Sequence, residues 1–350
     1  MKRIVALFLL AAVLMTACPY ALAEDPQPIA VIPKEEITPT LRGVHHYMLI
    51  CVDSWAADLT KEGNHTDGLM LVTVDELAHR VMLTSFIRDM LIMRPDGKFG
   101  RVNNIMDLMS PKTKTGIEGK EGIQYLIDTI NTHFDLEIEK FIVVDFKQVE
   151  NIIDAVGGVD ITITDREANY LKNYSISASS TTPSISSGGT YHFSGHAAVI
   201  YMRIRKVRTA DYVHADGETY HDTQDYGRTY RDRVVMTSIA DSLKDISYED
   251  ATKLLDVIIA NTVYTNMTID DLFSALDIAM DMRGVPVEHI RMPIDNPLHI
   301  LATPENFNKG MLSFIEFPYA GMATKEVNFE MNRTALHDFL FGTFVVVDDE

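Results

Sequence analysis

The sequence predicts an α/β fold, a three-layer α/β/α sandwich in which helices flank a central mixed, mostly parallel sheet. Short apolar runs typical of buried strands alternate along the chain with segments whose apolar residues recur at helical spacing. This alternation is typical of a sheet that is covered by helices on both faces. The chain has 350 residues, 46% of them hydrophobic, so it is long enough to bury a large core.

The first half of the chain contains four predicted strands and two predicted helices. Apolar runs predict the strands at residues 46–55, 69–75, 79–90 and 138–146. Apolar residues at helical spacing predict one helix from Gly119 and another from Gln148. The second helix should stop at Gly157–Gly158, because glycine tolerates the left-handed backbone found at helix ends.

The second half of the chain continues the alternation. Residues 159–165 alternate between apolar and polar with a period of two, which predicts a strand with one buried face. The segment 196–205 is predicted to end in a strand, so that Arg203 and Arg205 project from the same face. Helical patterns follow at residues 228–246 and twice between residues 247 and 282, where Thr268 to Asp271 form a predicted cap.

The N-terminus has the features of a targeting segment. Lys2 and Arg3 precede an uncharged apolar run, and Ala21-Leu22-Ala23 fits a signal-peptide cleavage site. Residues 1–23 are therefore predicted to be a cleaved signal peptide. Two alternatives are an uncleaved membrane anchor and a lipoprotein signal with Cys18 as the lipidated residue. All three place the bulk of the protein outside the cytoplasmic membrane.

Composition also predicts the domain boundaries. Residues 24–42 are rich in proline and charge and are predicted to be a linker. Residues 43–350 are predicted to form one domain that ends in a helical extension.

The charge of the chain restricts the ligands that it can bind. There are 50 acidic and 31 basic residues, a formal net charge of -19, which argues against a general nucleic-acid binder. An anionic ligand would have to be captured by a local cluster of cations. Several of the basic residues gather between Tyr201 and Val235, and they are Arg203, Arg205, Lys206, Arg208, Arg228, Arg231 and Arg233.

Charged residues also follow the predicted strands, where open α/β sheets bind their ligands. They are Asp53, Asp67 in the loop that follows, Arg88, Asp89, Arg203, Arg205 and, at the start of a helix, Arg228. Carboxylates beside several guanidinium groups suit a phosphate or pyrophosphate that is bound with Mg²⁺. The competing interpretation is ordinary surface ion pairing, which we expect for Arg208, Arg231 and Arg233.

Several segments resemble, in order and approximate spacing, motifs of the LytR-CpsA-Psr family, whose members join glycopolymers to peptidoglycan in the bacterial envelope. They are TDGLMLVTVD at 66–75, TSFIRDM at 84–90, a strand-helix-strand block at 141–163, GTYHFSGHAAVIYMRIR at 189–205 and DYGRTYRDR at 225–233. The resemblance covers roughly residues 47–244. It implies an α/β/α catalytic domain in which a hydrophobic pocket binds a polyprenyl pyrophosphate, while Mg²⁺ and arginines hold its head group.

The resemblance assigns roles to individual residues. Asp53 and Asp67 match the acids associated with the metal, which is Mg²⁺ or alternatively Mn²⁺. The residues that match the pyrophosphate site are Arg88, Arg203, Arg205, Arg228 and Asp232.

This sequence also departs from the family pattern. Asp232 stands where the family commonly has glutamine, and His65 and Ile87 replace a usual arginine and a usual proline. These departures put substrate choice and full activity in question.

The resulting functional hypothesis is a metal-dependent phosphotransferase of the cell envelope. Its donor would be a polyprenyl-pyrophosphate-linked glycopolymer of teichoic acid or capsular polysaccharide type. Its acceptor would be a peptidoglycan hydroxyl at the outer face of the cytoplasmic membrane. Arg88, Arg203 and Arg205 would stabilise the transferred phosphate, and Asp89 is the candidate for accepting the hydroxyl proton. The alternatives are a hydrolase of the same pyrophosphate and a non-catalytic, lipid-phosphate-binding regulator of the envelope.

Overall fold

The computed structural model describes residues 43–114, 116–174, 184–210, 212–213, 219–220, 224–294, 301–302, 314–315 and 325–342. The predicted signal segment and linker, residues 1–42, lie outside the described residues. Among the helices in the described ranges, none is both long and apolar enough to span a bilayer.

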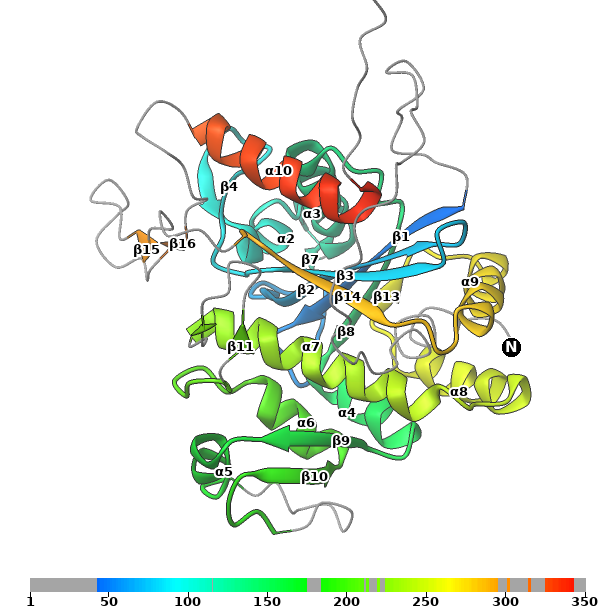
Figure 1. The fold of residues 1–350 in the computed structure, drawn as a ribbon. Coiled ribbons are helices and arrows are strands. Elements are labelled where there is room, and N and C mark those ends of the chain that lie inside the picture. Colours follow the sequence, from blue (N-terminus) through cyan, green and yellow to red (C-terminus); the bar gives the residue numbers. More distant parts are fainter. Residues whose placement is uncertain are drawn as a thin grey trace, which may run out of the picture.

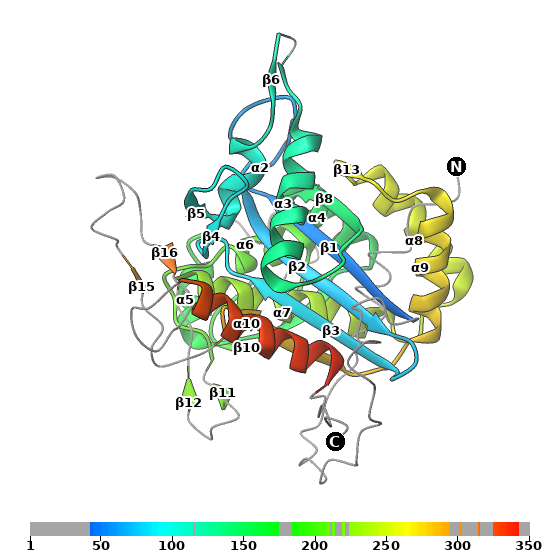
Figure 2. The same cartoon turned by 90° about the horizontal axis from the view of Figure 1, so that it is seen from above.

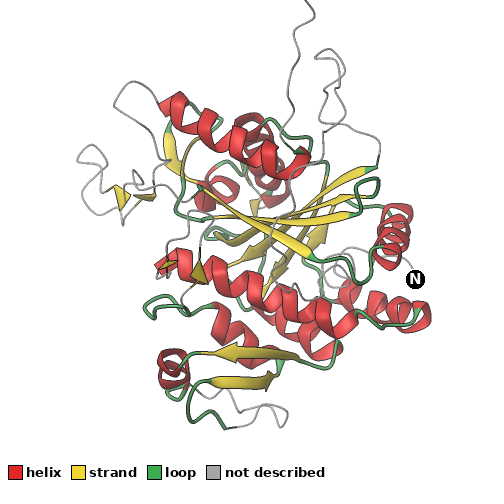
Figure 3. Ribbon diagram, in the orientation of Figure 1, coloured by secondary structure: helices red, strands yellow, loops and turns green. Residues whose placement is uncertain are grey.

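A six-stranded sheet forms the centre of the molecule, in the order β13-β8-β1-β2-β3-β14 (Figure 3). Its strands are β1 (Val44–Val52), β2 (Thr66–Asp75), β3 (Arg80–Phe86), β8 (Lys140–Asp145), β13 (Tyr264–Thr265) and β14 (Val287–Met292). β1 runs parallel to β8, and β14 runs parallel to β3. The other three pairings are antiparallel. The prediction of a mixed sheet is confirmed, but the expected parallel majority is wrong.

The reason for the error is the direct connection between consecutive strands. β2 and β3 are joined by only the four residues 76–79, and a connection this short can link only antiparallel neighbours. β1, β2 and β3 therefore pair in sequence as a meander. A parallel pair needs a long connection. β8 pairs with β1 in parallel, and the chain that leads from β3 back to β8 contains the helix α3 (Gly119–Phe134).

Helices cover both faces of the sheet (Figure 1). α3 and α10 (Lys325–Phe341) lie on one face, as the view in Figure 2 also shows. The other face carries α4 (Phe146–Ala155), α6 (Gly195–Met202), α7 (Gln224–Leu243) and α8 (Tyr248–Ala260). Alternate side chains of β1 enter two separate cores, with Leu49 packed on the α7 side and Ile50 on the α3 side. The predicted α/β/α sandwich is confirmed.

Smaller elements surround these layers. The hairpin of β9 (Val159–Ile163) and β10 (Gly189–Phe193) lies beyond the α6 layer, and α9 (Ile269–Asp281) lies at the β13 edge (Figures 1 and 2). The remaining elements are β4 (Leu91–Met93), β5 (Phe99–Arg101), η2 (Val102–Asn104), α2 (Ile105–Leu108), β6 (Lys112–Thr113), β7 (Gly116–Ile117), α5 (Asp165–Leu171), β11 (Tyr212–Val213), β12 (Thr219–Tyr220), β15 (Leu301–Ala302) and β16 (Phe314–Ile315).

Local signals in the sequence account for several element boundaries. Asp145 and Gln148 form a capping box that starts α4, two residues before the predicted start. Gly157 and Gly158 follow α4 with φ of 91° and 93°, as predicted for its end. Thr268 caps α9, also as predicted.

The segment that carries Arg203 and Arg205 differs from the prediction. Residues 195–202 form the helix α6, which begins with a hydrogen bond from Ala197 N to the Ser194 side chain. Arg203 is the C-cap of this helix, and Arg205 lies in the loop that follows, so they do not share a strand face. Periodicity alone does not separate a short apolar helix from a strand when the segment is buried on nearly all sides.

Arg231 fixes the loop that follows α6. This side chain is completely buried in α7, which contradicts its assignment to a surface ion pair. Its Nε lies 2.7 Å from Glu167 Oε1 of α5. Its two terminal nitrogens donate to the carbonyls of Ile204 and Val207, at 3.0 Å and 2.9 Å. Arg231 therefore holds in place the backbone on either side of Arg205.

We predict that Arg231→Met destabilises the fold by about 3–5 kcal/mol, because Glu167 would remain buried without its charged partner. The free energy of unfolding from urea titration measures this loss. Arg166→Met is the matched control, since Arg166 is exposed on the same helix as Glu167 and should change stability by less than about 0.5 kcal/mol. Equal effects of the two substitutions would contradict a structural role for Arg231.

Candidate functional site

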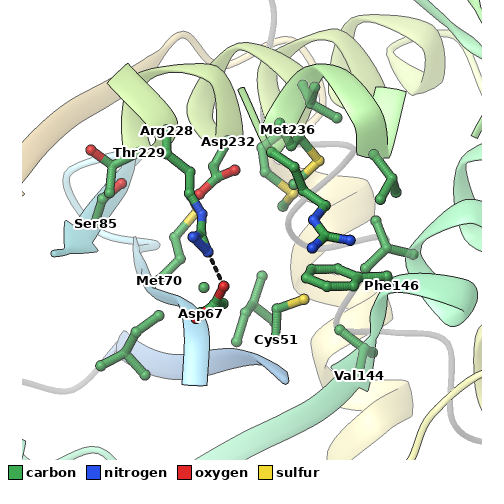
Figure 4. Close-up of a pocket in the computed structure, with 18 of the residues that line it drawn as sticks. Cys51, Asp67, Met70, Ser85, Val144, Phe146, Arg228, Thr229, Asp232 and Met236 are labelled. Atoms are coloured by element: carbon green, nitrogen blue, oxygen red, sulfur yellow. Dashed lines mark hydrogen bonds and ion pairs between the residues drawn. The ribbon is translucent and has the colours of Figure 1, made fainter. Parts of the chain in front are cut away.

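An apolar pocket lies between the sheet and the helices α4, α6 and α7, with about 920 Å³ of empty space including its opening (Figure 4). The apolar side chains that line it come from strands and helices alike, and they include Leu49, Leu69, Met70, Val144, Phe146, Val149, Ile152, Ile153, Val199, Met202, Val235, Met236 and Ile239. Such a lining suits a long hydrocarbon group.

Charge is concentrated at one end of this pocket. The lining runs along α7 from Arg228 to Ile239, a distance of about 16 Å at the helical rise per residue. Arg228 and Asp232 lie in the first turns of that helix, and Asp67 faces them from the start of β2 (Figure 4). The pocket therefore has an apolar length and a charged end.

Asp67 is the centre of the charged end. Its side chain is buried, with one carboxylate oxygen 2.5 Å from Arg88 Nη1 and the other in contact with Arg228 Nη2. The sequence placed Asp67 in a loop, but it belongs to β2. Arg88 follows β3, and Arg228 comes from the first turn of α7, so three distant segments meet at one carboxylate.

A second group of ion pairs surrounds Asp225, the residue that opens the DYGR motif. Asp225 Oδ1 lies 3.0 Å from Arg205 Nη2 and 3.4 Å from Arg88 Nε. Asp89 lies next to Asp225 and is 3.9 Å from the same two arginines, Arg88 and Arg205. Its Oδ1 also lies 3.4 Å from Arg101 Nε of β5. The predictions gave no role to Asp225 or Arg101. The position of Asp225 before Arg228 was a usable signal, whereas Arg101 is brought in by a hairpin that the sequence pattern did not reveal.

Asp89 and Asp225 are neighbouring buried carboxylates whose pKa values are shifted in opposite directions. Burial, together with the hydrogen bond and the charge of Asp225, raises the pKa of Asp89 to about 7. Burial also acts to raise the pKa of Asp225, but its hydrogen bond with Asp89 and the charge of Arg88 outweigh burial and leave that pKa below its usual value. Asp89 is therefore able to accept a proton at a pH where a catalytic base is useful.

Arg203 lies beside this cluster and forms its own contacts. Its Nη2 is 3.6 Å from Asp53 Oδ1, and its guanidinium group lies 4.2 Å from the centre of the Phe146 ring. Its side chain is 38% exposed, compared with 7% for Arg228, so Arg203 is the more accessible cation. The structure thus joins Arg88, Arg205 and Arg228 in one cluster and places Arg203 and Asp53 next to it.

The fit of the predicted metal depends on Asp53 and Asp67. Burial and the neighbouring charge of Asp67 raise the pKa of Asp53, as expected for two carboxylates that share a small space. Within the described part of the chain, no group of three or more histidine, cysteine, aspartate or glutamate side chains could hold a metal ion. Mg²⁺ is commonly bound by one or two carboxylates together with substrate phosphates and waters. The two aspartates match such a metal in chemical type, but both oxygens of Asp67 are engaged by Arg88 and Arg228 in this structure. Binding of the metal would therefore require one of these contacts to open.

Asp232 lines the pocket one helical turn after Arg228 (Figure 4). Burial raises the pKa of Asp232 to about 7, even though the charges of Arg228 and Arg233 act to lower it. The folded protein therefore keeps a proton on Asp232 at pH values where the unfolded chain releases it. Stability decreases as the pH rises from about 4 to about 7, and the full cost is present above pH 7.

We predict that Asp232→Asn stabilises the folded protein, because asparagine carries no charge to bury. The increase in melting temperature over the wild type should be small at pH 4 and largest at pH 8. Thermal unfolding at several pH values between these limits measures it. Asp256→Asn removes a charge from an exposed position on α8, and it is the control that should show no such trend. A gain independent of pH would contradict the protonation of Asp232.

Comparisons with known proteins agree with this architecture. Biofilm regulatory protein A of Streptococcus mutans is 25% identical over 273 residues, which cover 75% of this chain and 61% of that protein. The polyisoprenyl-teichoic acid--peptidoglycan teichoic acid transferase TagU of Bacillus licheniformis is 26% identical over 221 residues, covering 55% of this chain and 63% of that protein. The chain thus spans less than two thirds of the length of either relative.

Solved structures share the fold. The crystal structure of B. subtilis TagV superimposes on this structure with a TM-score of 0.57 at 18% identity, over 87% of this chain and 100% of that one. Protein gbs0355 from Streptococcus agalactiae gives a TM-score of 0.59 at 18% identity, over 86% of this chain and 89% of that one. The sequence model of the LytR_cpsA_psr family matches residues 42–309, which is well over half of the chain. The chain therefore belongs to the LytR_cpsA_psr family.

Proposed function

We propose that the protein is a phosphotransferase of the bacterial cell envelope that attaches a glycopolymer to peptidoglycan. The observation that carries this proposal is the pocket with an apolar length and a cluster of arginines and carboxylates at one end. A polyprenyl pyrophosphate has the same division, since a long hydrocarbon chain carries a compact anionic head group. The names of relatives such as TagU, a teichoic acid transferase, support the proposal.

The proposed reaction breaks the phosphoanhydride bond of the donor and forms a phosphodiester bond to the acceptor. A hydroxyl oxygen of peptidoglycan attacks the phosphorus that carries the glycopolymer, and the bond from that phosphorus to the polyprenyl phosphate oxygen breaks. The polyprenyl phosphate leaves with the electron pair, while the hydroxyl proton moves to Asp89. Negative charge grows on the leaving group, and positioned arginines stabilise such charge in phosphoryl transfer.

The arginines differ in how readily they can meet a substrate. Arg88 and Arg228 are mostly buried and paired with Asp67. Arg203 and Arg205 have side chains that are 38% and 37% exposed. We therefore assign the first contact with the pyrophosphate to Arg203 and Arg205. Arg228 is the less exposed arginine that lines the pocket, and Arg88 supports it through their shared contact with Asp67.

The two aspartates next to this cluster are the proposed metal ligands. Asp53 and Asp67 would hold Mg²⁺ together with oxygens of the bound pyrophosphate. When bound, the metal neutralises charge on the phosphate oxygens. The protein's own contribution is to keep the two carboxylates adjacent, with Arg88 and Arg228 paired to Asp67 and Arg203 next to Asp53.

We predict that Arg205→Ala lowers kcat/KM for transfer roughly ten- to hundredfold, the effect of losing one charged hydrogen bond to phosphate. The assay follows labelled glycan from a polyprenyl pyrophosphate donor onto peptidoglycan fragments. Arg205→Lys should restore little, because lysine lacks the planar, forked donors of arginine. Arg283→Ala is the matched control, since Arg283 is an exposed arginine that donates hydrogen bonds to the backbone carbonyls of Met280 and Ile246.

The same assay separates the alternatives. If the wild type catalyses transfer and a well-folded Arg205→Ala variant is equally active, the assigned role of the arginine cluster is contradicted. Release of glycan phosphate into solution without linkage to peptidoglycan would indicate a hydrolase. Binding of the donor without turnover would indicate a regulator.

A second prediction concerns the metal. Mg²⁺ should raise the affinity of the wild type for undecaprenyl pyrophosphate, and Asp53→Asn should reduce this increase by about tenfold or more, because one charged ligand is lost. In the presence of a chelator Asp53→Asn should bind no more weakly than the wild type, since it removes a negative charge beside the phosphates.

Isothermal titration with and without Mg²⁺ measures both quantities. Asp256→Asn controls for the change in net charge. If Mg²⁺ increases the affinity of Asp53→Asn and of the wild type equally, Asp53 is not a ligand.

A further inference from the structure

Trp55 is the only tryptophan of the chain, and it lies two residues beyond Asp53. Its side chain is 41% exposed although it belongs to the largest apolar residue type. One side of its ring is occupied, since the Phe146 ring lies 5.4 Å away and tilted by 60°. The His196 ring lies 6.2 Å away. An aromatic surface of this size is thus supported from within the protein and open on the outside.

The backbone around Trp55 is tied to the start of α4. Phe146 N donates to Ser54 O at 2.9 Å, and Ala57 N donates to Asp145 Oδ2 at 2.9 Å. Ala56 N also donates to the Ser54 side chain, at 3.1 Å. The two hydrogen bonds to residues of the α4 start bracket Trp55 and fix the loop that carries it. The ring is therefore already ordered in the folded protein, so a ligand that stacks on it loses little further conformational entropy of the loop.

The ring is continuous with the charged end of the pocket. Phe146 and Arg203 both line the pocket, and the Arg203 guanidinium lies 4.2 Å from the Phe146 ring and 5.7 Å from the Trp55 ring. Trp55 itself does not line the pocket. It lies next to Arg203, one of the two arginines that we assign to the first contact with pyrophosphate.

The proposed donor constrains what can lie at this position. Its first sugar is bonded directly to the pyrophosphate, so the ring must lie within a few bonds of the phosphates that Arg203 binds. One face of a pyranose consists of C–H groups, which carry partial positive charge, and the face of an aromatic ring carries partial negative charge. The flanking Asp53 and His196 supply polar groups for the hydroxyls around such a sugar.

We propose that Trp55, supported by Phe146, is a stacking platform for the first pyranose ring of the lipid-linked glycan. This inference rests on the proposed function and deepens it, because it gives the protein a contact that recognises the sugar separately from the lipid pyrophosphate. Trp55 is then a residue that determines donor specificity.

The test compares two ligands that differ by one sugar. Binding of undecaprenyl pyrophosphate, and of the same lipid carrying one N-acetylhexosamine on its pyrophosphate, is measured in detergent micelles. Trp55→Ala should weaken binding of the glycosylated lipid roughly three- to tenfold, the range for one aromatic contact, and leave the unglycosylated lipid unchanged. Trp55→Phe should retain most of the affinity. Tyr125→Ala is the control, since Tyr125 is an exposed aromatic residue of α3 on the other side of the sheet.

The single tryptophan provides an independent readout. Its fluorescence should shift or quench more with the glycosylated lipid than with the unglycosylated one. Equal losses for both lipids in Trp55→Ala would overturn the platform and indicate contact with lipid or membrane instead. Unchanged binding of both lipids with a raised KM for peptidoglycan would also overturn it and place the acceptor on Trp55. A wild type that binds neither lipid would overturn the proposed function and this inference with it.

Discussion

The contact of Asp67 with Arg88 and Arg228 is the interaction on which the charged end of the pocket depends. It joins the start of β2, the segment after β3 and the first turn of α7, which are far apart in the sequence. Two guanidinium groups would repel each other in this buried position without a carboxylate between them. Asp67 therefore permits the sheet and α7 to bring their arginines to one point, where the apolar pocket also opens.

Internal carboxylates also explain how so acidic a chain maintains a cluster of arginines in a largely buried position. The arginines of the cluster form ion pairs with Asp67, Asp89 and Asp225, and each of these three aspartates is buried. Removing one partner from such a network leaves an uncompensated charge, which is strongly destabilising. The carboxylates thus keep the arginines in position. The net binding free energy of a phosphate ligand is then only the difference between its own contacts with the arginines and those of the carboxylates. This favours a ligand with several charges and a bound metal over a single phosphate.

The sequence predicted the parts of the fold that depend on local chemistry. The end of α4 at Gly157 and the cap of α9 at Thr268 follow from backbone preferences and short-range hydrogen bonds. The error at residues 195–202 arose because a helix buried on all sides has no polar stripe to reveal its period. The relative direction of the strands was also predicted wrongly, because strand pairing is decided by the connections between strands and by packing across the sheet. The motifs located most of the charged residues, but which cations are buried depends on contacts between distant segments. Arg231, with its contact to Glu167, is the clearest example.

The pocket between the sheet and the α7 layer has a consequence for the lifetime of the protein. Empty apolar space inside a domain forgoes packing that neighbouring layers would otherwise provide. A hydrocarbon chain that fills it restores those contacts, and any ligand that binds only the folded state shifts the folding equilibrium by mass action. Resistance to unfolding and proteolysis should then follow the supply of lipid. If the lipid donor proposed above binds in this pocket, copies of the protein without lipid would be degraded first, and the amount of the protein would follow the supply of that lipid.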